Sequence, residues 1–173
     1  MLVANSVRLR VMRSTDAGAI LKIYEEGIQT GHATFEAEVP DWHKWDSGHL
    51  TQCRWLAGEE DTVLGWGALT QVSPRKVYSG VAEVSIYVSL NAQNQGIGSI
   101  LLERLIISSE ESGFWTLQAQ VFPENKFSIY VHEKHGFRKS GLHRQLALIF
   151  YGSMAGEWRD VVLMERRSKI VGI

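Results

Sequence analysis

One stretch of the sequence, residues 81–99, combines a strand, a glycine-containing loop and a helix without interruption. From Val81 to Val88 apolar and polar residues alternate, which is typical of a strand with one polar face. The loop QNQGIG follows at 93–98, and apolar residues then recur at helical spacing from Ile97 to Leu105. This order brings glycines and free backbone N–H groups to the positive end of a helix, where a phosphate or pyrophosphate can bind.

Two familiar nucleotide-binding patterns do not match this loop. The Walker pattern GxxxxGK followed by Ser or Thr is missing, and the dinucleotide pattern GxGxxG fails because Leu101 stands where its third glycine would be. A GxG ahead of a helix can also be only a turn. The pattern that the loop does match is QxxGxG, at 93–98. Together with the preceding SIYV strand, it resembles the acyl-coenzyme-A pyrophosphate loop of the GNAT N-acetyltransferase superfamily.

The composition limits the classes of function. With 173 residues the chain has the length of about one domain with a sizeable core. Its 18 Lys and Arg residues balance 19 Asp and Glu residues without a basic cluster, so no nucleic-acid or membrane partner is expected. Cys53 is the single cysteine, and neither a membrane span nor an N-terminal leader is recognisable. A cytoplasmic protein with small-molecule partners is expected.

Apolar periodicity and capping residues predict the order of the elements. Strands are expected at 7–11, 54–57, 62–70, 81–88, 116–121, 137–142, 146–151 and 159–164, and helices at 17–27, from Asp41 toward Cys53, at 97–112 and at 126–135. The first helix is expected to stop at Gly27. The order predicts an α+β fold with helices flanking a mixed, mostly antiparallel sheet, in one domain, residues 1–173, whose core spans about 7–166.

Beyond the loop, the chain resembles the phosphinothricin and methionine sulfoximine acetyltransferase group of the GNAT superfamily. The segments that carry the resemblance are IYEEGIQTGHATFEAE at 23–38, Arg75-x-x-Tyr78, AEVS at 82–85, Asn125-x-x-Ser128, HEKHGF at 132–137 and GEWRD at 156–160. The resemblance implies the GNAT fold and an acetyl-CoA-dependent N-acetyltransferase for the amino group of a small amino acid or a toxic amino-acid analogue. It also implies a homodimer, which would bury part of the Trp42–Trp45 region or the final hairpin.

Acyl transfer from a thioester requires a neutral amine, a base and donors for the oxyanion that forms. The resemblance makes Glu83 the base, on the strand face that also carries Ser85 and Tyr87. The alternative is a solvated or ion-paired strand glutamate. His132 stands where many GNAT enzymes carry the tyrosine that protonates the thiolate, and histidine there can act as acid or base. A packing or hydrogen-bonding histidine is the alternative.

The resemblance also implies the residues that hold acetyl-CoA. They are Ile86, Tyr87 and Val88 on the strand, Asn94, Gln95, Gly96, Ile97, Gly98 and Ser99 in the loop, and Asn125 and Ser128 ahead of the later helix. The Val88 N–H would polarise the thioester carbonyl, and Asn125 would bind the pantetheine arm, although Asn125 is equally suited to cap a helix. His132 and His135 lack a third ligand at a recognisable spacing, so no metal is expected.

An amino-acid acceptor carries a carboxylate, and in this group a second polar or anionic end, so its pocket needs planar, permanently charged donors. Arg75 matches the group's loop arginine, and Tyr78 can add a hydroxyl donor. Phe35 and Glu36 are expected on the opposite wall, facing the amino end. A solvated arginine beside Lys76 is the alternative for Arg75. Two other functions stay open: a non-catalytic acyl-CoA sensor, and an acetyltransferase for a protein N-terminus or a polyamine.

Overall fold

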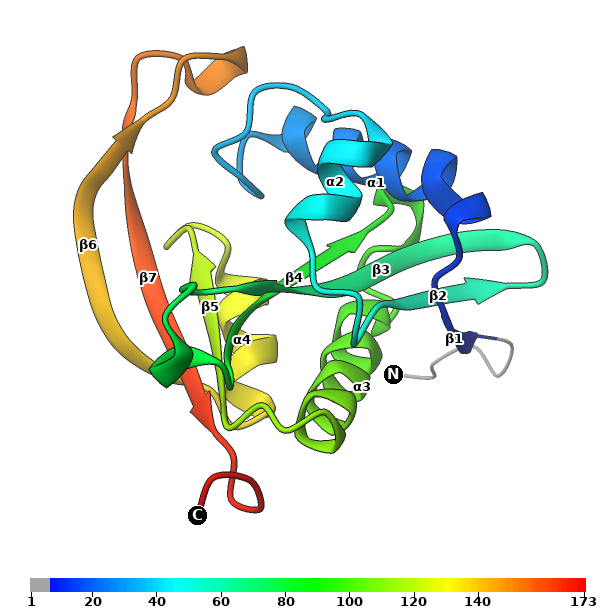
Figure 1. Ribbon diagram of the computed structural model, residues 1–173. Helices are drawn as coiled ribbons and strands as arrows, with labels where there is room; N and C mark the ends of the chain where they lie inside the picture. The colour runs from blue at the N-terminus through cyan, green and yellow to red at the C-terminus, as the bar shows by residue number, and fades with distance from the viewer. Residues whose placement is uncertain (1–6) are drawn as a thin grey trace.

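The computed structural model describes residues 7–173 and contains a seven-stranded sheet with four α-helices (Figure 1). The strands are β1 (Arg8–Val11), β2 (Trp55–Glu59), β3 (Thr62–Gln71), β4 (Val81–Val88), β5 (Thr116–Val121), β6 (Arg138–Leu148) and β7 (Trp158–Arg167). The helices are α1 (Ala17–Thr30), α2 (Trp42–Gly48), α3 (Ile97–Glu111) and α4 (Lys126–Lys134). The predicted α+β class with a mixed, mostly antiparallel sheet is confirmed. Residues 1–6, which entered the prediction that no leader is present, lie outside the described residues.

The strand order is β1-β2-β3-β4-β5-β7-β6, and within residues 7–173 only β4 and β5 pair in parallel. Those two strands share a short ladder, with Val81–Glu83 opposite Thr116–Gln118. Beyond Glu83 the strands separate, and residues 84–88 of β4 keep their pairing with β3 alone. The sheet is therefore split in its middle, and the edge of β4 that faces the split has backbone groups free to bind another molecule.

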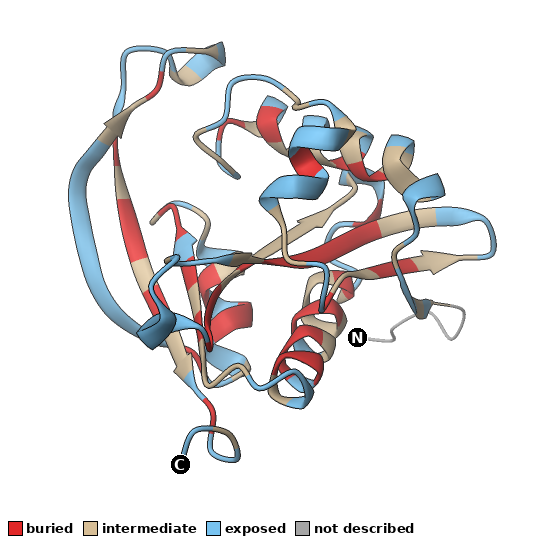
Figure 2. Cartoon of the chain, in the orientation of Figure 1, coloured by how far each residue is buried: buried red, intermediate tan, exposed pale blue. Residues whose placement is uncertain are grey.

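Helices cover both faces of the sheet. α3 and α4 lie on one face, and α1 and α2 lie on the other (Figure 1). Alternation along the central strands supplies both cores: Val84 on β4 packs into the cluster that contains Leu102 of α3, while Trp66 on β3 packs with Ile20 of α1 and Trp45 of α2. Figure 2 shows the buried residues concentrated on α3 and the middle strands. These two cores hold the walls of the split in place.

The end of α1 differs from the sequence prediction. The helix runs to Thr30, and Gly31 closes it in the left-handed conformation at φ 68°, with its N–H donating to the Ile28 carbonyl. Gly27 is required for packing, because a Cβ at this position would lie only 2.8 Å from Cδ1 of Tyr87. The glycine allows the tyrosine ring to approach the helix, and it does not terminate the helix.

The second helix starts as predicted and ends earlier. The Asp41 carboxylate accepts the Lys44 N–H at 2.8 Å, which caps α2. α2 stops at Gly48 and does not extend toward Cys53, which adopts a φ of 59°. A positive φ cannot belong to a right-handed helix, so the backbone at Cys53 rules out a continuous helix there.

The final hairpin also corrects the prediction. The two strands expected at 137–142 and 146–151 merge into one long strand, β6, which ends at Leu148. Gln145 has a φ of 47° and donates its N–H to the Asp160 carboxylate at 2.7 Å, where the register with β7 shifts. This irregularity interrupts the polar–apolar alternation, and the sequence pattern therefore indicated a break. Most of β6 is exposed to solvent (Figure 2).

Candidate active site

A cavity of about 790 Å³ opens where β4 and β5 separate. Its walls come from β4, the loop ahead of α3, the turn between β5 and α4, the first turns of α4 and the segment between α1 and α2. Of the predicted site residues, the cavity is lined by Phe35, Glu36, Glu83, Ile86, Tyr87, Val88, Asn94, Gly96, Ile97, Gly98, Asn125, Ser128 and His132. The structure therefore brings together residues that are far apart in the sequence.

The loop ahead of α3 is shaped to receive an anionic group. Gly96 adopts a φ of 82°, which a side chain disfavours. Its carbonyl accepts the N–H groups of Ser99 and Ile100 at 3.1 and 3.2 Å. The N–H groups of Ile97 and Gly98 precede these first helical bonds and lie at the positive end of the helix. The loop thus fits the predicted pyrophosphate site.

Two predicted coenzyme residues do not line the cavity. The side-chain amide of Gln95 donates to the Asn91 carbonyl at 3.1 Å, and the Ser99 hydroxyl lies 2.7 Å from Nε2 of His135. These contacts stabilise the loop and the start of α3 from outside the cavity. Direct binding of the coenzyme by Gln95 and Ser99 stays a prediction.

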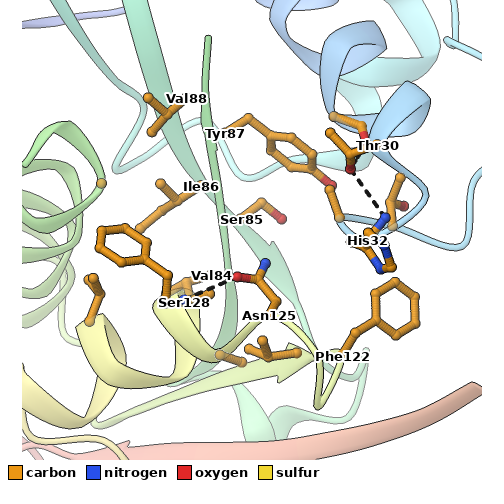
Figure 3. Close-up of a pocket in the computed structure, with 18 of the residues that line it drawn as sticks. Thr30, His32, Val84, Ser85, Ile86, Tyr87, Val88, Phe122, Asn125 and Ser128 are labelled. Carbon is orange, nitrogen blue, oxygen red and sulfur yellow. Dashed lines mark hydrogen bonds between the residues drawn. The ribbon is translucent and has the colours of Figure 1, made fainter. Parts of the chain in front are cut away.

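Asn125 has one of the two roles that the sequence left open, the helix cap. Its Oδ1 accepts the Ser128 N–H at 3.1 Å, which caps α4. Asn125 and Ser128 also face the β4 strand across the cavity, opposite Val84 and Ser85 (Figure 3). The cap fixes the side chain at the point where a ligand lying along β4 would pass it.

Glu83 lies at the last β4 position that pairs with β5. It is half-buried and lines the cavity. Gln120 on β5 donates its Nε2–H to Oε2 of Glu83 at 2.8 Å, and no ion pair of Glu83 occurs among residues 7–173. The ion-paired alternative is therefore not what the structure shows. A neutral amide holds one carboxylate oxygen, and Oε1 can take a proton from an amine in the cavity.

His132 is buried on α4, and its two ring nitrogens differ. Nδ1 lies 2.8 Å from the Ser128 carbonyl, which can only accept, so Nδ1 carries the proton. Nε2 has no hydrogen-bond partner among the described residues. Burial lowers the pKa of His132, and the neighbouring His135 lowers it further against the opposing effect of the Ser128 hydrogen bond. At neutral pH His132 is therefore a neutral imidazole, and its unprotonated Nε2 is itself buried.

The segment between α1 and α2 forms another wall of the cavity. The Tyr151 hydroxyl donates to the Thr34 carbonyl at 2.8 Å, and the Phe35 ring meets Phe122 edge-on at 4.8 Å. Tyr87 points toward this segment from β4 (Figure 3). Burial raises the pKa of Tyr87 far above its ordinary value, so its hydroxyl remains a hydrogen-bond donor at neutral pH.

Arg75 and Tyr78 lie outside the cavity. They are exposed in the connection between β3 and β4, where the Arg75 guanidinium lies 5.5 Å from the centre of the Tyr78 ring. A single chain therefore does not bring them to Phe35 and Glu36. Their predicted contact with the acceptor stays a prediction.

Three residues that support the site were not among those predicted from the sequence. Gln120 holds Glu83, Tyr151 holds the segment between α1 and α2, and Arg159 binds the same segment from β7. Arg159 belongs to the GEWRD run. The sequence feature that could have indicated it is a charged residue inside an expected strand of the sheet. A charge that is buried in such a place usually has specific partners.

Neither a membrane-spanning helix nor a group of three His, Cys, Asp or Glu side chains able to hold a metal ion occurs in the part of the chain that the structure describes.

Comparisons with known proteins agree with this geometry. Residues 19–137 match the acetyltransferase (GNAT) family. The chain is 33% identical over 168 residues to the phosphinothricin N-acetyltransferase of Alcaligenes faecalis, covering 91% of this chain and 81% of that protein. It is 27% identical to the L-methionine sulfoximine/L-methionine sulfone acetyltransferase of Pseudomonas aeruginosa, covering 92% and 94%. The crystal structure of a GNAT superfamily phosphinothricin acetyltransferase from Sinorhizobium meliloti in complex with AcCoA superimposes with a TM-score of 0.84 at 26% identity, covering 96% and 91%. The chain therefore belongs to the GNAT family of acetyltransferases.

Proposed function

We propose that the protein transfers the acetyl group of acetyl-CoA to the amino group of a small amino acid or of a toxic analogue of the phosphinothricin or methionine sulfoximine type. The observation that carries this proposal is the meeting of two sets of groups in one cavity. The N–H donors ahead of α3 and the free edge of β4 suit the coenzyme, while Glu83 and Glu36 come from different walls and suit an amine. Relatives that acetylate phosphinothricin and methionine sulfoximine support the acceptor class.

The residues present fit acetyl-CoA. Residues 84–88 of β4 offer backbone groups to the amide-containing pantetheine arm, and Asn125 offers its side chain from the other wall. Gly96 and Gly98 leave the start of α3 uncovered for the pyrophosphate. When bound, the coenzyme supplies an activated acetyl group as its thioester. The N–H of Val88 is proposed to polarise the thioester carbonyl.

Glu83 is proposed as the base. It takes a proton from the ammonium form of the acceptor, and the neutral nitrogen then attacks the thioester carbonyl carbon; the C–S bond breaks and the thiolate leaves. A specific role is proposed for His132, whose Nε2 starts without a proton. His132 is therefore proposed to take the second proton, which the acceptor nitrogen loses after it attacks, and to give that proton to the thiolate. It does not begin the cycle as the acid.

A homodimer is proposed to complete the acceptor pocket, which in one chain lacks Arg75 and Tyr78. Trp45 is buried within its own chain, so the Trp42–Trp45 region is a poor contact surface. The final hairpin is the better surface because several large apolar side chains on it are exposed. They are Leu142, Leu146, Phe150 and Trp158. Exposed apolar groups gathered in this way mark protein contact sites.

A panel of acceptors with acetyl-CoA, followed by release of free thiol, tests the proposed function. We expect turnover with at least one amino acid or amino-acid analogue, and Glu83→Gln is expected to lower kcat at neutral pH on the order of 100-fold or more while acetyl-CoA affinity stays unchanged. Binding of acetyl-CoA with no turnover on any acceptor would favour the sensor. Turnover confined to peptides or polyamines would favour the other acetyltransferases, and full activity of Glu83→Gln would place the base elsewhere.

A further inference from the structure

Arg159 on β7 is 2% exposed and does not line the cavity, yet it carries a permanent charge. Its Nη1 donates to the Gly31 carbonyl at 2.9 Å, and its Nη2 donates to Oε2 of Glu124 at 3.1 Å. Nη2 also lies 3.2 Å from Nδ1 of His32, which must be the acceptor because a guanidinium has only donors. One side chain therefore ties β7 both to the end of α1 and to the turn between β5 and α4.

Burial of this guanidinium is costly, so its position calls for an explanation. Its Nε has no hydrogen-bond partner within residues 7–173, and a buried unpaired N–H is unfavourable. The charge is balanced by Glu124, whose side chain is 56% exposed. An apolar residue would fill this place without either cost. The contacts that Arg159 makes with the cavity walls are the feature that an apolar residue could not supply.

Arg159 also reaches residues 31–36, the acceptor wall of the cavity, through a chain of side-chain contacts. The Arg159 guanidinium lies 4.1 Å from the centre of the Phe122 ring, and Phe122 meets Phe35 edge-on. Phe35, Phe122, His32 and Glu124 all line the cavity. Figure 3 shows His32 and Phe122 together at one end of it. Arg159 thus supports both the backbone and the side chains of this wall from behind.

We propose that Arg159 is a positioning residue that fixes residues 31–36, the acceptor segment, and thereby sets the affinity for the acceptor without touching it. This inference rests on the proposed function, since it assigns residues 31–36 to the amine acceptor. Coenzyme binding is expected not to depend on Arg159, because Asn125 is held by its own cap on α4. Loss of Arg159 therefore loosens the acceptor wall and leaves the coenzyme wall in place.

Arg159→Leu tests the proposal, with Arg166→Leu as the matched control. Arg166 lies on the same strand and pairs with Glu110 at 2.9 Å; its side chain is 21% exposed, and neither of these two residues lines the cavity. In Arg159→Leu we expect faster amide hydrogen exchange across residues 31–36 and an acceptor KM raised on the order of tenfold or more, with the KM for acetyl-CoA within about threefold of wild type. Arg166→Leu is expected to change none of these quantities.

Arg159→Lys provides a second variant if the leucine variant does not fold. It keeps a charge opposite Glu124 and loses the planar fork, so its exchange rates and acceptor KM should be intermediate. Unchanged exchange across residues 31–36 in the Arg159 variants, or an equal rise in acceptor KM in Arg166→Leu, would overturn the proposal. If the wild-type enzyme acetylates no amino acid, the proposed function fails, and the exchange comparison alone then decides whether Arg159 fixes residues 31–36.

Discussion

Replacing Gly98 with alanine is expected to raise stability and to weaken coenzyme binding. Gly98 is the second residue of α3 and has an ordinary helical φ, and the nearest heavy atom to an added Cβ would be Cγ2 of Val88 at 3.8 Å. The methyl group therefore fits the folded chain. Alanine is favoured over glycine by up to about 1 kcal/mol in a helix interior and by less near its start, so Tm should rise by about 1–3 °C.

The same methyl group lies on the cavity side of the loop, because Gly98 lines the cavity. There it meets the path by which a phosphate reaches the N–H groups of Ile97 and Gly98. Loss of one hydrogen bond to a charged group costs about 1.5–3 kcal/mol, so the dissociation constant of acetyl-CoA should rise roughly 10- to 100-fold. The opposite signs of the two effects separate this outcome from general damage to the fold.

Gly18→Ala is the matched control. Gly18 is the second residue of α1, and an added Cβ there would have no heavy atom within 4 Å. It should give a similar gain in Tm and leave coenzyme affinity unchanged. Thermal unfolding without ligand and calorimetry with acetyl-CoA measure the two effects. If Gly98→Ala gains stability but binds acetyl-CoA as tightly as wild type, the pyrophosphate does not approach over Gly98, and the loop assignment is wrong.

Three further predictions concern the acceptor, pH and assembly. Arg75→Ala is expected to raise the acceptor KM about tenfold or more at an unchanged KM for acetyl-CoA, and an unaltered acceptor KM in steady-state kinetics would place the acceptor carboxylate elsewhere. Burial lowers the pKa of His132 and of His49, so the unfolded chain binds more protons than the folded chain as pH falls below about 6.5. The free energy of unfolding should therefore decrease from pH 7 to pH 5 in urea titrations, and equal values at both pH would contradict it. Light scattering at micromolar concentration should give the mass of two 19.5 kDa chains, and the mass of one chain would refute the homodimer.

The fold could be predicted where the signal was local. The change from alternation to helical spacing between Val88 and Ile97 marks the strand, loop and helix of the proposed coenzyme wall, and the structure has these elements at those positions. Gly27 misled the prediction because its role depends on Tyr87, which is distant in the sequence. Gln145 misled it because a bulge inside β6 imitates the end of a strand. In both places tertiary structure decided the outcome, and a local pattern could not contain that information.

The proposed coenzyme side and the proposed acceptor side of the cavity also differ in how far the sequence could predict them. The proposed coenzyme loop is one continuous segment, so its resemblance to the GNAT loop could be recognised in a single stretch of sequence. The acceptor wall is assembled by contacts such as those from Arg159 to Gly31 and from Tyr151 to Thr34, which join residues 128 and 117 positions apart. No spacing rule connects such pairs. The resemblance to a family supplied Phe35 and Glu36, but the residues that hold them in place emerged only in the structure.

The split in the sheet explains why the acceptor wall needs such support. β5 pairs with β7 along its whole length and with β4 over only three residues, so β5 follows β7 and leaves β4. β4 stays extended because its pairing with β3 continues from Ala82 to Val88. The free edge of β4 is therefore held by a complete ladder, and coenzyme binding needs little ordering there. Residues 31–36 have no strand pairing, and side chains must hold them instead, which is the role that falls to Arg159 and Tyr151.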